Sequence, residues 1–143
     1  MPIGFATYRD FRLLFIRGHG VITQTERVEA MLSWLNDPGY QHCTDALFDV
    51  TAAESTPRLA ELREIIAILR RSLPSSGPRR LAIVTAKPIT YAVARVFQDL
   101  VLKDVPLQVR VFMDREVAWA WLRPGESLPD ATYQGADSTH PAN

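Results

Sequence analysis

The chain has 143 residues, and its 47% hydrophobic and 22% charged content is typical of one soluble globular domain. Sixteen basic and sixteen acidic side chains cancel, which argues against a nucleic-acid-binding protein, because such proteins depend on excess positive charge. Cys43 is the single cysteine, so no intrachain disulfide can form, and no second Cys/His cluster is present to complete a metal site. We therefore expect no metal and no cofactor.

The start of the chain has no signal-peptide pattern, and no stretch approaches the roughly 20 apolar residues that span a bilayer. A reducing, cytoplasmic setting without a membrane span is the expectation.

The first elements expected are two closely spaced strands, at residues 5–8 and 12–17, which favour a hairpin. Thr23 and Glu26 then stand at the spacing of a capping box, in which each side chain bonds the other residue's backbone N–H. Apolar residues follow at helical spacing until the stop signal Asn36-Asp37-Pro38-Gly39. This pattern predicts a helix between the hairpin and the next strand.

The third strand is expected at residues 46–51, and a second helix from Pro57 to about Leu73. Thr56 is a suitable N-cap, and proline is tolerated at the first helical position because its missing N–H would be unpaired there anyway. Leucine and isoleucine recur on one side of this segment, which favours a helix face packed on a core over a coiled coil.

The fourth strand, residues 81–85, is apolar until its last residue, as a strand covered on both faces requires. Lys87-Pro88 opens a third helix. Residues 107–112 alternate apolar and polar side chains like an edge strand, and residues 114–122 form a short final helix.

Helices between the later strands force crossover connections, which normally join parallel strands. We therefore predict a single-domain α/β fold for residues 1–122: a mixed five-stranded sheet, with an N-terminal hairpin followed by parallel strands, and about four helices. Residues 123–143 are rich in Pro, Gly, Ser, Asp and Thr, which predicts a mobile or disordered C-terminal tail.

Sequence signatures of catalysis are missing: the chain has no Gly-x-Ser-x-Gly elbow, no His-Glu-x-x-His and no phosphate-binding loop. We therefore expect a protein without enzymatic activity. An enzyme that used Asp49 or Lys87 stays as an alternative, and it would need a deep pocket that holds both side chains.

Polar side chains gather where the parallel strands are expected to end, the edge at which α/β proteins usually bind ligands. Two groups of residues are candidates. The first is a partner-binding or regulatory loop: Asp49, Thr51, Glu54, Ser55 and Thr56. The second is a rim for a small ligand: Thr85, Lys87, Asp114 and Arg115. Helix and loop capping is the alternative for each position taken singly, although an acid inside an apolar strand, such as Asp49, must find partners or face solvent.

The order of elements and the stretches at residues 12–23, 46–50 and 81–84 resemble the bacterial STAS-like (SpoIIAA-like) proteins. That family is related in fold to the anti-sigma-factor antagonists and more distantly to the CRAL-TRIO lipid-transfer domains. The resemblance covers about residues 5–122. In the antagonists, the matching strand leads into an Asp-Ser-Ser/Thr-Gly turn whose serine is phosphorylated by a partner kinase. The matching turn here is Glu54-Ser55-Thr56-Pro57, with proline in place of the glycine.

The resemblance implies a non-catalytic protein-interaction module in bacterial regulation or signalling, which binds a partner protein or a second copy of itself and is linked to phosphorylation of Ser55 or Thr56. A phosphate there would lie at a helix N-terminus, where the helix dipole favours it. The alternative, from the lipid-transfer relationship and the apolar helices, is a binding protein for a small apolar or lipid-like ligand.

Overall fold

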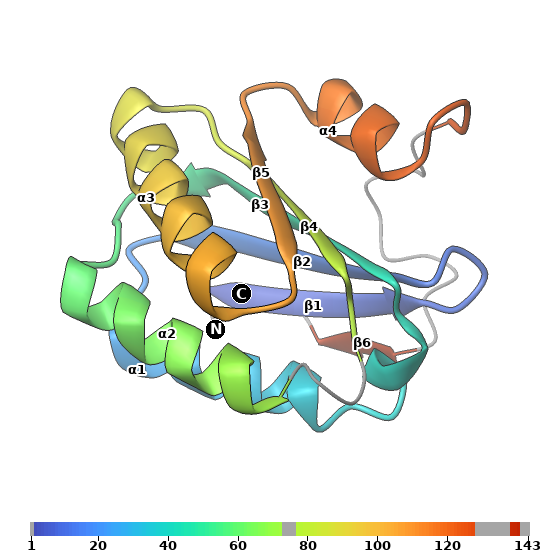
Figure 1. Ribbon diagram of the computed structural model, residues 1–143, viewed down its shortest axis with the longest axis horizontal. Helices are drawn as coiled ribbons and strands as arrows, with labels where there is room; N and C mark the ends of the chain where they lie inside the picture. Colours follow the sequence, from blue (N-terminus) through green and yellow to red (C-terminus); the bar gives the residue numbers. More distant parts are fainter. Residues whose placement is uncertain (1, 73–76, 128–137, 141–143) are drawn as a thin grey trace.

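The computed structural model describes residues 2–72, 77–127 and 138–140. Strands and helices alternate after an initial hairpin (Figure 1). The strands are β1 (Ile3–Tyr8), β2 (Leu13–Gly20), β3 (Asp45–Ala53), β4 (Arg80–Val84), β5 (Gln108–Phe112) and β6 (Ser138–His140). The helices are α1 (Gln24–Leu35), the 3-10 turn η1 (Tyr40–His42), α2 (Leu59–Ser72), α3 (Pro88–Asp104) and α4 (Arg115–Leu122).

The strands form one mixed sheet in the order β5-β4-β3-β2-β1-β6. β1 and β2 pair antiparallel as the predicted hairpin, while β2, β3, β4 and β5 are parallel neighbours. The predicted mixed α/β fold with its five main strands and four α-helices is thus confirmed. An additional three-residue strand, β6, pairs antiparallel with β1 and was not expected.

The predicted C-terminal tail is described only in part. Residues 128–137 and 141–143 lie outside the described residues, so the mobility of this tail stays a prediction. Residues 138–140 of the same segment are the ones that form β6.

The sheet carries helices on both faces, so alternate residues of each strand enter different cores. The larger core lies between the sheet and the helices α1, α2 and α3, and the smaller one lies beneath α4. Figure 1 shows α4 well apart from α1 and α2. In β3, Ala46 and Phe48 belong to the three-helix side, whereas Leu47 belongs to the α4 side.

Local signals account for the starts of α1, α3 and α4. Thr23 and Glu26 form the predicted capping box at α1, and Pro88 occupies the first turn of α3 after Lys87. The Asp114 carboxylate accepts the N–H groups of Glu116 and Val117 at the start of α4. These three helix starts were therefore predictable from local chemistry.

The predicted start of α2 is wrong. The helix begins at Leu59 rather than Pro57, and Thr56 is not its N-cap. A residue before proline is driven towards extended backbone, so Thr56 and Pro57 continue as a connecting segment. The Glu61 carboxylate instead accepts the N–H of Arg58, 2.8 Å away, at the first turn. The strand before this segment is also longer than predicted, because β3 continues to Ala53.

Candidate functional site

A cavity of about 160 Å³ lies between the sheet and helices α1, α2 and α3. Its walls are almost entirely apolar and include Ala46, Phe48, Val50, Met31 and Phe97. Protein interiors are packed to crystal density, and an engineered cavity of similar size with an apolar lining binds benzene. The space is therefore large enough for an apolar ring or a short hydrocarbon chain.

Helix α2 forms one wall of this space. The helix packs against its neighbours α1 and α3 more closely than against any strand. Its apolar stripe, including Leu62 and Leu69, lines the cavity. Below it, Phe48 and Val50 remain only half-buried although β3 is an inner strand of the sheet.

Most polar side chains of the cavity wall gather at one end. Arg27 on α1, Ser55 and Thr56 before α2, and Thr90 in the first turn of α3 all line it. These helices follow β2, β3 and β4, so the polar end lies at the carboxyl edge of the parallel strands. The candidate residues Ser55 and Thr56 thus belong to the cavity.

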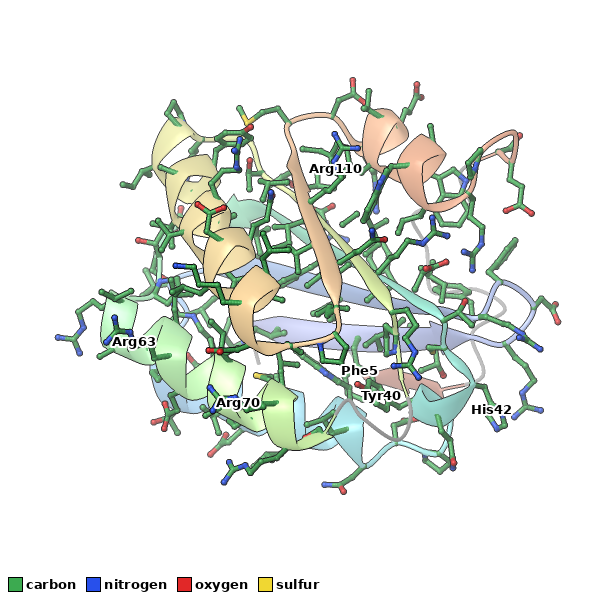
Figure 2. The ribbon with its side chains drawn as sticks, viewed as in Figure 1. Phe5, Tyr40, His42, Arg63, Arg70 and Arg110 are labelled. Carbon is green, nitrogen blue, oxygen red and sulfur yellow. The ribbon has the colours of Figure 1, made fainter. Side chains whose placement is uncertain are left out.

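Tyr40 of the 3-10 turn η1 also lines the cavity. It is 5% exposed, and burial raises the pKa of its phenol to about 12, so this ring is neutral at ordinary pH. Figure 2 shows Tyr40 pointing inward and His42 of the same turn pointing outward.

The Ser55 hydroxyl joins the two loops at the polar end. It accepts the N–H of Ile22 at 2.8 Å and donates to the carbonyl of Ile22 at 3.1 Å. Next to it, the N–H of Glu54 donates to the carbonyl of Gly20 at 2.8 Å, while Glu54 itself is exposed. Ser55 therefore holds the loop after β2 against the loop after β3.

Asp49, Thr51 and Arg115 lie on the opposite, α4-covered side of the sheet. One carboxylate oxygen of Asp49 accepts the N–H of Thr51 at 2.9 Å and its hydroxyl at 2.7 Å, and the other oxygen lies 3.7 Å from the Arg115 guanidinium. Arg115 also lies over the Phe15 ring, 5.2 Å from its centre. These contacts explain how an acid is accommodated in an apolar strand.

The other rim candidates bond to the protein's own backbone. The Lys87 ammonium donates to the carbonyl of Ala53 at 3.2 Å, and the fully buried Thr85 hydroxyl donates to the carbonyl of Phe112 at 3.3 Å. Asp114 caps α4. Neither Asp49 nor Lys87 lines the cavity, so the deep shared pocket that an enzyme using both would need is not formed there.

A buried ion-pair cluster at the amino-terminal ends of β3 and β4 was not predicted from the sequence. Asp45 is 2% exposed; its carboxylate accepts from Arg80 Nε at 3.1 Å and also contacts the Arg123 guanidinium. Arg80 further donates to the carbonyls of Trp121 and Leu122, which anchors the C-terminal end of α4. The available signal was a charged residue directly before each of two apolar runs, Asp45 and Arg80. The sheet pairs these two residues as neighbours on β3 and β4.

Within residues 2–72, 77–127 and 138–140, no group of three or more His, Cys, Asp or Glu side chains is arranged to hold a metal ion. In the same part of the chain, no helix has the length and apolar character needed to cross a membrane.

No family model matches the chain, and no curated protein matches it by sequence. Among solved structures, it is similar to an uncharacterised protein of the DUF3478 family with a SpoIIAA-like fold from Shewanella loihica PV-4. The two are 20% identical, the match covers 84% of this chain and 91% of that one, and the TM-score is 0.49. The expected relationship to CRAL-TRIO domains finds no support in these comparisons.

Proposed function

We propose that this chain is a non-catalytic, cytoplasmic binding protein for a small apolar molecule, which it holds between the sheet and helices α1, α2 and α3. The observation that supports this proposal is the apolar cavity of about 160 Å³. A ligand that fills this space removes its apolar walls from water and gains dispersion contacts with them. Binding to the folded state alone also stabilises the fold.

Toluene is a suitable probe because it is uncharged and close in size to the cavity. We expect saturable toluene binding that raises the melting temperature and shifts the NMR signals of cavity methyl groups, including those of Met31 and Val50. Native mass spectrometry of the purified protein tests whether a natural ligand accompanies it.

The matched variant is Ala46→Leu/Ala94→Leu, which adds six carbon atoms to the cavity wall. It should abolish toluene binding, whereas Ala60→Leu on the exposed side of α2 should leave binding unchanged. Absence of saturable binding by the wild-type protein, or equal binding by the filled variant, would contradict the proposal.

A second candidate, the protein-interaction module, is favoured by a group of exposed apolar side chains. All lie just after a strand or at the first turns of a helix, along the carboxyl edge of the parallel strands. We call them the carboxyl-edge patch: Val21, Leu59, Ile89, Met113 and Val117, which are 50–67% exposed. Exposed apolar groups of this kind are common in partner-binding surfaces.

This second candidate is tested in a bacterial lysate and by sedimentation of the pure protein. We expect Val21→Ser/Ile89→Ser to lose a partner, or a second copy, that the wild type binds. Leu102→Ser, near the far end of α3 and 81% exposed, is the control that should keep it. Wild-type protein that captures no partner and sediments as a monomer would refute this candidate.

Phosphorylation of Ser55 would regulate this protein-interaction module. A phosphate on its oxygen removes the hydroxyl proton donated to Ile22 and crowds the Ile22 N–H. The loops after β2 and β3 would then separate beside the cavity and the patch. Phosphoproteomic detection of Ser55 modification in the native host would support this regulation.

A further inference from the structure

We propose that Arg27 binds the head group of the cavity's ligand, and that this ligand is a small amphiphile with a carboxylate head and an apolar tail. The inference rests on the proposed ligand-binding function and specifies its ligand class.

The position of Arg27 suits a contact with a ligand head group. It lies one turn into α1, is half-buried, and lines the polar end of the otherwise apolar cavity. Burial lowers the pKa of Arg27, against the opposing effect of Glu61 and Glu26. A cation that has lost part of its water gains most from a direct anionic partner.

The neighbouring carboxylates are already engaged elsewhere. Glu26 accepts both the N–H and the hydroxyl of Thr23, at 2.9 and 3.0 Å. Glu61 accepts the N–H of Arg58 at 2.8 Å and lies 3.5 Å from its guanidinium. Among the described residues, no carboxylate lies within ion-pair distance of Arg27.

Arg27 also keeps most of its donors available. Its one side-chain hydrogen bond within the described chain goes to Gln24 Oε1 at 3.3 Å, whereas a guanidinium has five N–H donors. The Gln24 amide in turn donates to the Glu64 carboxylate at 2.7 Å, so Gln24 orients Arg27 without neutralising it. The remaining N–H groups form the planar fork that binds a carboxylate in a bidentate manner.

Two hydroxyls complete the head-group end. Thr56 and Thr90 line the cavity beside Arg27, and neither hydroxyl forms a hydrogen bond within the described residues. Thr90 is 8% exposed, so its hydroxyl gains from a polar ligand atom. The nearby acids Glu26, Glu61 and Glu64 favour a head with one negative charge over a doubly charged phosphate.

The cavity volume limits the tail. An engineered cavity of about 150 Å³ accommodates benzene, so the 160 Å³ space here accepts a ring or a chain of about six to eight carbons. Octanoate is therefore a suitable probe, with 1-octanol as the uncharged molecule of matched length.

Isothermal titration calorimetry at pH 7 tests the proposal with the full-length protein. Arg27→Gln should weaken octanoate binding by about 10- to 100-fold, the range expected for a charged hydrogen-bonded pair, and leave 1-octanol binding unchanged. Arg63→Gln, which removes an arginine from the exposed side of α2, is the control and should bind octanoate like the wild type (Figure 2). Arg27→Lys keeps the charge without the fork and should show an intermediate loss.

The outcomes separate the two proposals. Equal octanoate affinity in the wild type and Arg27→Gln, with 1-octanol bound by both, overturns the role of Arg27 and leaves the apolar-ligand proposal standing. Failure of the wild type to bind octanoate, 1-octanol or toluene overturns both. If Arg27→Gln does not fold, the Arg27→Lys titration decides, and wild-type octanoate affinity in that variant overturns the bidentate head-group contact.

Discussion

Adding carbon atoms to Ala94 should stabilise this protein, the opposite of the usual effect in a packed core. Ala94 is 8% exposed on α3 and lines the cavity. Burial of the three carbon atoms added by Ala94→Leu should stabilise the folded state by about 2.4 kcal/mol. The loss of side-chain conformational entropy opposes this gain by about 0.5–1 kcal/mol. We therefore expect a net stabilisation of about 1.5–2 kcal/mol.

The matched control is Ala118→Leu. Ala118 is fully buried in the smaller core beneath α4 and does not line the cavity. Extra carbon atoms there displace well-packed neighbours, at a cost of about 1–3 kcal/mol. The same chemical change should thus have opposite signs on the two faces of the sheet.

Urea unfolding of ligand-stripped protein, followed by circular dichroism, measures both free energies of unfolding. Stripping matters, because a bound ligand stabilises the wild type and would be lost from Ala94→Leu. A similar destabilisation in both variants would refute the argument, since it would show that the space beside Ala94 is filled by the protein itself.

Three further predictions concern single groups. Asp45→Asn should lower the free energy of unfolding by about 3 kcal/mol in urea, because it leaves two partly buried arginines without their carboxylate, and a loss below about 1 kcal/mol would contradict this. Ser55→Ala removes both bonds to Ile22 and should cost about 1–2 kcal/mol and speed amide exchange at Ile22; Thr56→Ala, the control, should leave that exchange unchanged. Burial raises the pKa of Tyr40 from 10 to about 12, so the neutral phenol favours the folded state: this contribution is complete below pH 10 and is lost as pH rises from 10 to 12. Absorbance titration should show a late-ionising tyrosine signal that Tyr40→Phe removes, and a titration curve that Tyr40→Phe leaves unchanged would disprove it.

Most of the fold could be predicted because its signals are local. Thr23 and Glu26 specify the start of α1 within four residues, and the apolar run of β4 identifies a strand covered on both faces. The start of α2 was misplaced because two local rules compete at Pro57. Proline is acceptable in the first turn of a helix, but it also drives Thr56 into extended backbone, and the second effect prevails.

The cavity could not be predicted in the same way. An apolar stripe such as that of α2 is identical in sequence whether the helix rests on the sheet or is held above it by its neighbours. The distance between α2 and the sheet depends on how α2 packs against α1 and α3, which are distant in sequence. Arg27 carried no signal for the same reason, since a charged residue in the first turns of a helix is ordinary until the space beside it is known.

Side chains along β3 point alternately to the two faces of the sheet, so the polar residues from Asp49 to Thr56 lie on both faces. Successive side chains of a strand face opposite sides, so Asp49 binds Arg115 beneath α4 while its neighbour Val50 lines the cavity. Ser55 and Thr56 then follow on the cavity side, after the strand has ended. Residues that seemed to form one loop site therefore belong to two environments separated by the sheet. On the Asp49 side, the carboxylate lies 3.7 Å from the Arg115 guanidinium and accepts the Thr51 hydroxyl. On the cavity side, Arg27 has no carboxylate partner among the described residues, and the walls around the space are mostly apolar. Under the proposed function, the ligand therefore binds on the three-helix face, and the ion pair of Asp49 with Arg115 links β3 to α4.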